Sequence, residues 1–93
     1  MAQATILASG TTLATSSDVV VAAGATVSIG LFTADAAGIP GNHSAVIMME
    51  TPSVDVVVDE LSGVRPVRVV AGPGTFRVIR RAGTTSFGVF TET

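Results

Sequence analysis

The residues of this 93-residue chain that could perform chemistry are few. There is one histidine, His43, and the stretch ADAAGIPGNHS also places Asp35 and Ser44 near it. These residue types form hydrolytic triads, but a triad needs a fixed geometry that a Gly- and Pro-rich loop does not supply. A metal site would have to add Glu50, and no ligand spacing supports one. We therefore expect His43 to be a solvated loop residue, and we expect no catalytic residue, no metal and no cofactor.

Asp55 and Asp59 are a carboxylate pair that could be proposed for glycoside hydrolysis. At i and i+4 of one strand they lie about 13 Å apart, since a strand rises about 3.3 Å per residue. That distance exceeds the separation of both glycosidase classes. The GPG at 72–74 is followed by a strand rather than by a phosphate-binding helix, so it indicates a turn. These patterns predict that the chain is not an enzyme.

The basic residues form one block. All five are arginines between Arg65 and Arg81, whereas residues 1–60 hold six acidic residues and no basic one. Single-strand nucleic-acid binders and sugar-binding modules both use stacking aromatics, and this chain has no Trp and no Tyr. We therefore expect no nucleic-acid partner. The asymmetry favours contact between the two halves of the chain or between subunits.

Every element that the sequence predicts is a β-strand. Short runs rich in Val, Ile and Thr alternate with Gly, Pro, Ser and Asn. They predict strands near 3–8, 17–22, 25–33, 44–50, 53–60, 64–70, 75–81 and 84–91. The fold class is all-β, a single antiparallel β-sandwich or jelly-roll-like domain of about eight strands over residues 1–93. Residues 1–16 form either an N-terminal arm or the first strand, and the alternation of Ile6 and Ala8 favours the strand.

Three turns predict three hairpins. A turn at Ala82-Gly83 sets Arg81 opposite Thr84. Its core face would then carry Phe76, Val78, Phe87 and Val89. Its outer face would carry Arg77, Arg81 and Phe90. Arg80 would lie on the core side with its charged end reaching solvent.

The second hairpin turns at Leu61-Ser62 and places Asp55 opposite Arg68. Its core face would carry Val54, Val56, Val58, Val67 and Val69. Pro66 lacks an N–H group and predicts an edge strand or a bulge. The third hairpin turns at Ala23-Gly24, and its core face carries Val27, Ile29 and Leu31.

The composition points to assembly. Hydrophobic residues make up 47% of the chain and charged residues 13%, about half the charged share of an average globular domain. Such a surface suggests that a partner covers part of it. The chain has no cysteine, it begins without the pattern of a secretion signal, and no apolar run is long enough to span a bilayer. We expect no membrane partner.

The runs SSDVVVAAGATVSIGLF and VVAGPGTFRVIRRAGTTSFGVFTET resemble the small β-sandwich structural proteins of tailed bacteriophage virions. The nearest type is the capsid decoration, or cement, protein. The resemblance implies a non-enzymatic protein of the virion, made in the host cytoplasm, that binds the major capsid protein on the outer capsid surface. It also implies a homotrimer.

In that setting the outward Arg77 and Arg81 would meet acidic groups of a neighbouring copy or of the capsid. The predicted contact residues are Arg77, Arg81, Phe90, Asp55, Asp59 and Arg68. The alternative is that these charges pair within one chain. A head–tail connector or fibre-base component, and a jelly-roll ligand-binding or adhesion module, are the competing functions.

Overall fold

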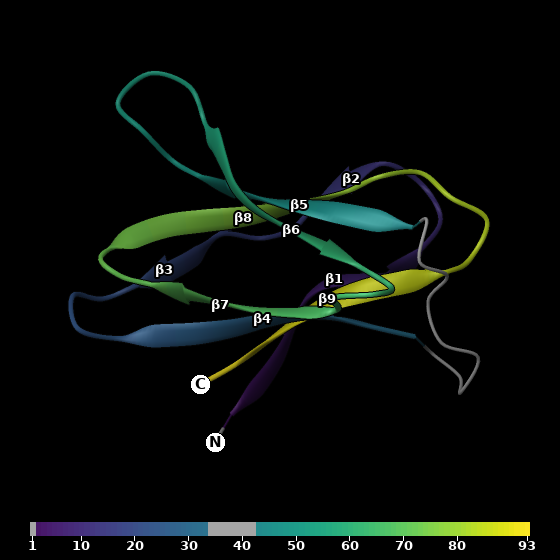
Figure 1. Ribbon diagram of the computed structural model, residues 1–93, viewed down its shortest axis with the longest axis horizontal. Helices are drawn as coiled ribbons and strands as arrows, with labels where there is room; N and C mark the ends of the chain where they lie inside the picture. Colours follow the sequence, from purple (N-terminus) through teal and green to yellow (C-terminus); the bar gives the residue numbers. More distant parts are fainter. Residues whose placement is uncertain (1, 34–42) are drawn as a thin grey trace.

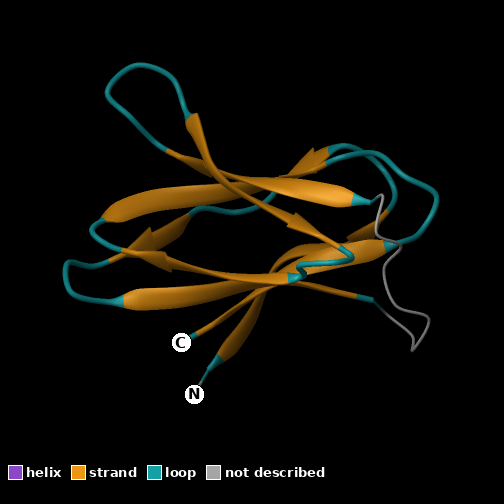
Figure 2. Ribbon diagram, viewed as in Figure 1, coloured by secondary structure: helices purple, strands orange, loops and turns teal. Residues whose placement is uncertain are grey.

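A computed structural model describes residues 2–33 and 43–93, and this part of the chain contains nine strands and no helix, so it has no helix that could cross a membrane (Figures 1 and 2). The strands are β1 (Gln3–Gly10), β2 (Ala14–Thr15), β3 (Val19–Val21), β4 (Thr26–Phe32), β5 (Ser44–Met49), β6 (Val56–Ser62), β7 (Val67–Ala71), β8 (Gly74–Arg80) and β9 (Phe87–Glu92). The predicted all-β class is confirmed.

Two antiparallel sheets form the layers of a β-sandwich (Figure 1). Sheet A has four strands in the order β1-β9-β4-β7. Sheet B has five, in the order β2-β8-β5-β6 with β3 also paired to β8. The strands β6 and β7 are therefore the edge strands at one side of the sandwich, and β6 contacts both β7 and β4 of the opposite sheet.

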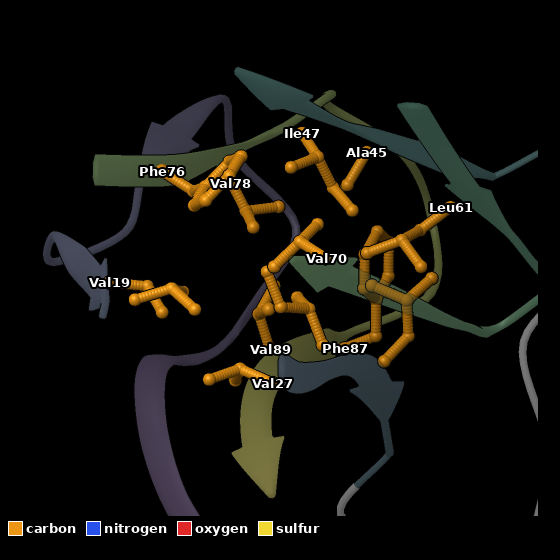
Figure 3. Close-up of a cluster of buried hydrophobic side chains, with 13 residues drawn as sticks. Val19, Val27, Ala45, Ile47, Leu61, Val70, Phe76, Val78, Phe87 and Val89 are labelled. Carbon is orange, nitrogen blue, oxygen red and sulfur yellow. The ribbon is translucent and has the colours of Figure 1, made fainter. Parts of the chain in front are cut away.

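The core fills the space between the layers (Figure 3). Strand alternation places every second side chain of β4, β8 and β9 inside, because successive residues of a strand point to opposite faces. The largest fully buried side chains are Phe87, Ile29, Ile47, Leu61, Val78 and Val89. The core stripes predicted for the first and third hairpins, which include Phe76 and Val27, are confirmed as buried.

None of the three predicted turns joins two strands of one sheet, so the cross-strand pairs predicted at the first two are wrong. The turn at Ala23-Gly24 exists, with the Ala25 N–H donating to the Ala22 carbonyl over 3.1 Å and Gly24 at a φ of 79°. It joins β3 of sheet B to β4 of sheet A, however, so the two strands face each other across the core. The connections from β6 to β7 and from β8 to β9 also change sheets, and no Arg81–Thr84 pair forms. Among the described strands, only β5 and β6 are consecutive and paired.

The valine stripe of the second hairpin is the prediction that fails outright. All of Val54, Val56, Val58, Val67 and Val69 are exposed. Leu61, which we placed in the turn, is fully buried at the end of β6. The edge position predicted for the strand after Pro66 is confirmed, since β7 ends sheet A.

The N-terminal residues form a strand and not an arm. β1 pairs with β9 along most of its length, from Gln3 opposite Glu92 to Gly10 opposite Phe87. β2 then crosses to sheet B, where Ala14 lies opposite Arg80. The two ends of the chain therefore lie side by side (Figure 1).

Candidate interaction surface

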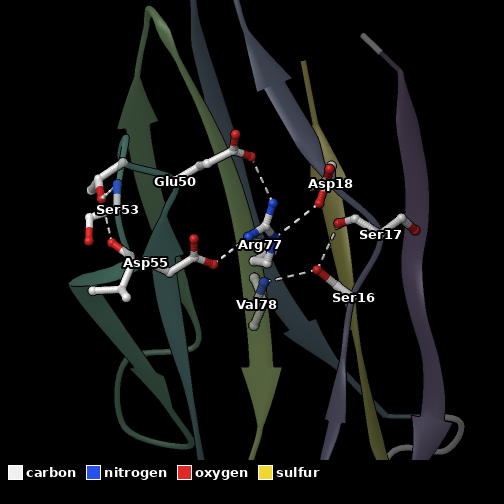
Figure 4. Close-up of polar contacts among 10 residues, drawn as sticks. Ser16, Ser17, Asp18, Glu50, Ser53, Asp55, Arg77 and Val78 are labelled. Carbon is white, nitrogen blue, oxygen red and sulfur yellow. Dashed lines mark hydrogen bonds and ion pairs between the residues drawn. The ribbon is translucent and has the colours of Figure 1, made fainter.

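Arg77 is the centre of an ionic network on the outer face of sheet B (Figure 4). Its Nε lies 3.0 Å from Oδ1 of Asp18, and its Nη2 lies 3.0 Å from Oε2 of Glu50. Its Nη1 also donates to Asp55. Asp18 belongs to the β2–β3 connection, and Glu50 and Asp55 are the two ends of the β5–β6 connection, so one outward arginine of β8 joins two connections. The hydrogen bond to Asp18, followed by that to Asp55, raises the pKa of Arg77 above its ordinary value.

Two further ion pairs use predicted site residues. Nη1 of Arg81 lies 3.2 Å from Oε2 of Glu60, with both side chains about half exposed. Nε of Arg68 lies 2.9 Å from Oδ2 of Asp59 and joins the edge strands of the two sheets. The hydrogen bond from Arg68 holds the pKa of Asp59 below its ordinary value. The predicted pairing of Asp55 with Arg68 is therefore wrong, because Asp59 takes that position.

These pairs match the alternative that the sequence left open, pairing within one chain. The structure brings Arg77 and Asp55 together, and separately Arg68 and Asp59. It places Phe90 elsewhere, on the outer face of sheet A beside Phe32, with ring centroids 6.3 Å apart. Contact of these residues with a partner stays a prediction.

Arg80 is buried, which corrects the expectation that its charged end reaches solvent. Only 4% of the residue is exposed. Its Nε donates to the Thr12 carbonyl over 2.9 Å, and its Nη1 donates to the carbonyls of Ala8 and Phe87 over 2.8 Å each. The guanidinium therefore ties the β1–β2 connection to β8 and β9. This is a structural use of the arginine block that the sequence analysis did not anticipate.

His43 is also buried, and the expectation of a solvated loop histidine is wrong. Its Nε2 accepts the backbone N–H groups of Thr84 and Thr85 over 3.0 and 3.2 Å. Its ring stands edge-on to Phe87, and a side chain at Gly83 would collide with it. His43 thus holds the β8–β9 connection in place. Asp35, the acidic member of the considered triad, lies outside the described residues.

The exposed large hydrophobic residues gather on one side of the sandwich. In the described part of the chain there are nine, and seven of them lie between residues 54 and 69. We call these seven the valine edge: Val54, Val56, Val57, Val58, Val64, Val67 and Val69. They belong to the edge strands β6 and β7 and their flanking turns, with Val57 on the outer face of sheet B and Val67 and Val69 on the outer face of sheet A.

Sequence reasoning missed the valine edge because it assigned the alternate residues Val54, Val56, Val58, Val67 and Val69 to the core. One signal was available. The same alternation places Val57 on the opposite face, so at least one valine of the run had to point to the outside of the sandwich.

A second feature is a hollow of about 560 Å³ on the outer face of sheet A. Its lining is Gln3, Ala4, Thr5, Phe32 and Phe90. The two rings lie over glycines, since a side chain at Gly30 would collide with Phe90 and one at Gly88 with Phe32. Gln3 donates to the carboxylate of Glu92 at 3.0 Å beside it.

The described residues contain no cluster of His, Asp or Glu side chains that could hold a metal ion. Comparison of the chain with protein-family models, with curated proteins and with solved structures finds no match.

Proposed function

We propose that the chain is a non-enzymatic structural protein of the decoration, or cement, type, which binds the outer surface of a tailed-phage capsid. The observation that supports this most is the valine edge. Seven large apolar side chains exposed on two edge strands and their turns are many for a soluble monomer of this size, and exposed apolar surface of this kind marks interaction sites. A decoration protein would cover this apolar surface when it binds to its partner.

The placement of charge supports the same proposal. Arg77, Arg81 and Arg68 each bind carboxylates of their own chain. Ion pairs satisfied within one chain leave apolar packing as the main source of binding energy for a partner. Charged residues at the rim of the contact would then determine its register and the choice of partner more than its affinity.

Co-sedimentation tests the proposal directly. Purified protein is mixed with empty heads of the phage that encodes it and pelleted over a titration. Saturable binding at a fixed ratio to the major capsid protein is the expected result. Heads that pellet without the protein, while isolated tails retain it, would instead indicate a connector or fibre-base component.

The hollow at Phe32 and Phe90 favours a second candidate, a ligand-binding or adhesion module. Its volume lies within the roughly 300–1,000 Å³ of small-molecule sites. Two phenyl rings beside Gln3 and Glu92 offer both an apolar surface and hydrogen-bonding groups. Phe90→Ala separates the two functions. It should abolish ligand binding by a module, whereas it should leave capsid binding through the valine edge intact.

A further inference from the structure

We propose that the hollow on the outer face of sheet A binds an organic cation, a guanidinium or primary ammonium group on an aliphatic stem. This ligand class rests on the second candidate function, a ligand-binding module, and it does not depend on capsid binding. Three features of the hollow support it. They are two phenyl rings, a set of hydrogen-bond acceptors, and a carboxylate that no basic side chain of the same face neutralises.

The register of sheet A places both rings on its outer face. Phe90 of β9 lies opposite Thr5 of β1 and Gly30 of β4. Phe32 of β4 lies opposite Gly88 of β9. Each phenylalanine follows a buried residue of its strand, and successive strand residues point to opposite sides. The rings therefore stand outside the core, on the two central strands of the sheet.

Glycines under the rings let them lie close to the sheet. A Cβ at Gly30 would lie 2.6 Å from the ring of Phe90, and one at Gly88 would lie 2.7 Å from the ring of Phe32. The two ring planes meet at 65° with centroids 6.3 Å apart, so the rings form a corner and not a flat platform. The face of an aromatic ring carries partial negative charge and attracts a cation within about 6 Å of its centroid. A corner of two phenyl rings thus suits a cation on an apolar stem.

The polar groups beside the rings are mainly acceptors. Nε2 of Gln3 donates to Oε1 of Glu92 over 3.0 Å, so the carbonyl oxygen of Gln3 and the second carboxylate oxygen of Glu92 keep their lone pairs for a ligand. Thr5 also lines the hollow, and its hydroxyl can accept a hydrogen bond as well. A matching ligand must therefore supply N–H donors. Charged donors form the stronger hydrogen bonds to a carboxylate.

Glu92 is the only charged side chain that the described strands place on the outer face of sheet A. The remaining outward positions of β1, β4, β7 and β9 hold uncharged residue types. Arg68 of β7 points the other way, towards Asp59. Arg65 precedes β7, so β4 and β9 separate it from β1. The carboxylate of Glu92 is therefore available to a cation from outside the chain.

The cation has to come from another molecule. This chain has no lysine, and Arg68, Arg77, Arg80 and Arg81 bind groups of their own chain. A free small cation and an arginine or lysine side chain of another protein offer the same chemistry. The form in which the cation is presented separates these two sources.

Titrations followed by the amide resonances of isotope-labelled protein test the site, because they measure weak binding and place it in the structure. The first two probes are Nα-acetyl-arginine amide and Nα-acetyl-citrulline amide, which have nearly the same shape but differ in charge. A third probe, a blocked Gly-Gly-Arg-Gly-Gly peptide, presents the guanidinium as a protein would. The variant is E92Q. Its matched control, E60Q, removes the same charge from a half-exposed carboxylate of sheet B.

The arginine amide should shift the amide resonances of Gly30, Gly88 and Phe90, with a dissociation constant on the order of millimolar, as exposed cation–ring and ion-pair contacts allow. The citrulline amide should bind about tenfold more weakly, a change that corresponds to about 1.4 kcal/mol. E92Q should weaken binding of the arginine amide severalfold, whereas E60Q should bind it like the unchanged protein. Rising salt should weaken binding too.

The peptide probe identifies the source of the cation. Tighter binding of the peptide than of the arginine amide assigns the site to a protein side chain, and equal binding assigns it to a free cation. Either result supports the cation site.

Equal binding of the arginine and citrulline amides at the hollow overturns the cation as ligand and leaves a module for neutral ligands standing. Equal weakening by E92Q and E60Q, or unshifted resonances around Gly30 and Gly88 with every probe, also overturns the inference. Head binding of the unchanged protein is scored separately. Failure of the decoration function and failure of the cation site therefore give different results.

Discussion

Replacing Arg80 by methionine tests whether the buried guanidinium fastens the N-terminal part of the sandwich. Methionine keeps much of the apolar stem and removes all three hydrogen bonds to the carbonyls of Ala8, Thr12 and Phe87. A hydrogen bond to a charged group contributes about 1.5–3 kcal/mol, and contributions within one site do not add fully. We expect R80M to lower the free energy of unfolding by about 3–5 kcal/mol.

That loss is a large part of the roughly 5–15 kcal/mol that stabilises a small domain. It corresponds to a fall in Tm of at least about 12 °C, since 1 kcal/mol shifts Tm by about 4–8 °C at this size. Urea denaturation followed by circular dichroism measures it. The matched control is R81M, one residue further along, whose ion pair with Glu60 is about half exposed. An exposed pair contributes at most about 1 kcal/mol.

The contrast between neighbouring arginines is the decisive result. Equal losses for R80M and R81M would refute the account of Arg80, because only the guanidinium of Arg80 is buried on backbone carbonyls. If R80M is too unstable to purify, R80K provides the test. It keeps the charge but loses the forked geometry, and it should lie between R81M and complete loss of folding.

Two other predictions follow from the buried and paired groups. H43L should destabilise the fold by roughly 2–3 kcal/mol, because it leaves the N–H groups of Thr84 and Thr85 without their acceptor. Hydrogen exchange should become faster at these two amides. Unchanged protection of both amides would contradict the role of His43. Asp59 has a pKa below its ordinary value of 3.8 when folded, mainly through its hydrogen bond from Arg68. Its stabilisation is therefore present above about pH 4 and is lost as the pH falls through the folded pKa. D59N should weaken the dependence of the denaturation midpoint on pH in the acid range. A plot of midpoint against pH for D59N that runs parallel to that of the unchanged protein would contradict this role of Asp59.

Sequence reasoning correctly predicted the features that depend on residues close together in the sequence. Alternation in VSIGLF, TFRVIR and SFGVF identified the inward residues of β4, β8 and β9. Gly24 marked a turn because its positive φ is costly for any other residue, and Pro66 marked an edge strand because it cannot donate a hydrogen bond. For the candidate site, the sequence identified charged residues that do form ion pairs, but it gave several of them the wrong partners.

The tertiary structure alone decided which sheet each strand joins. Two alternating strands joined by a turn can lie side by side in one sheet or face each other across the core, and both arrangements bury the same residues. The choice depends on pairing with strands far away in the sequence, such as β1 with β9 and β3 with β8. The register of β7 with β4 turned Arg68 and Val70 inwards and Val67 and Val69 outwards, so valines that read as core came to lie in water. Local chemistry therefore determined the strands, the turns and most of the core, whereas long-range pairing determined the surface on which the proposed function rests.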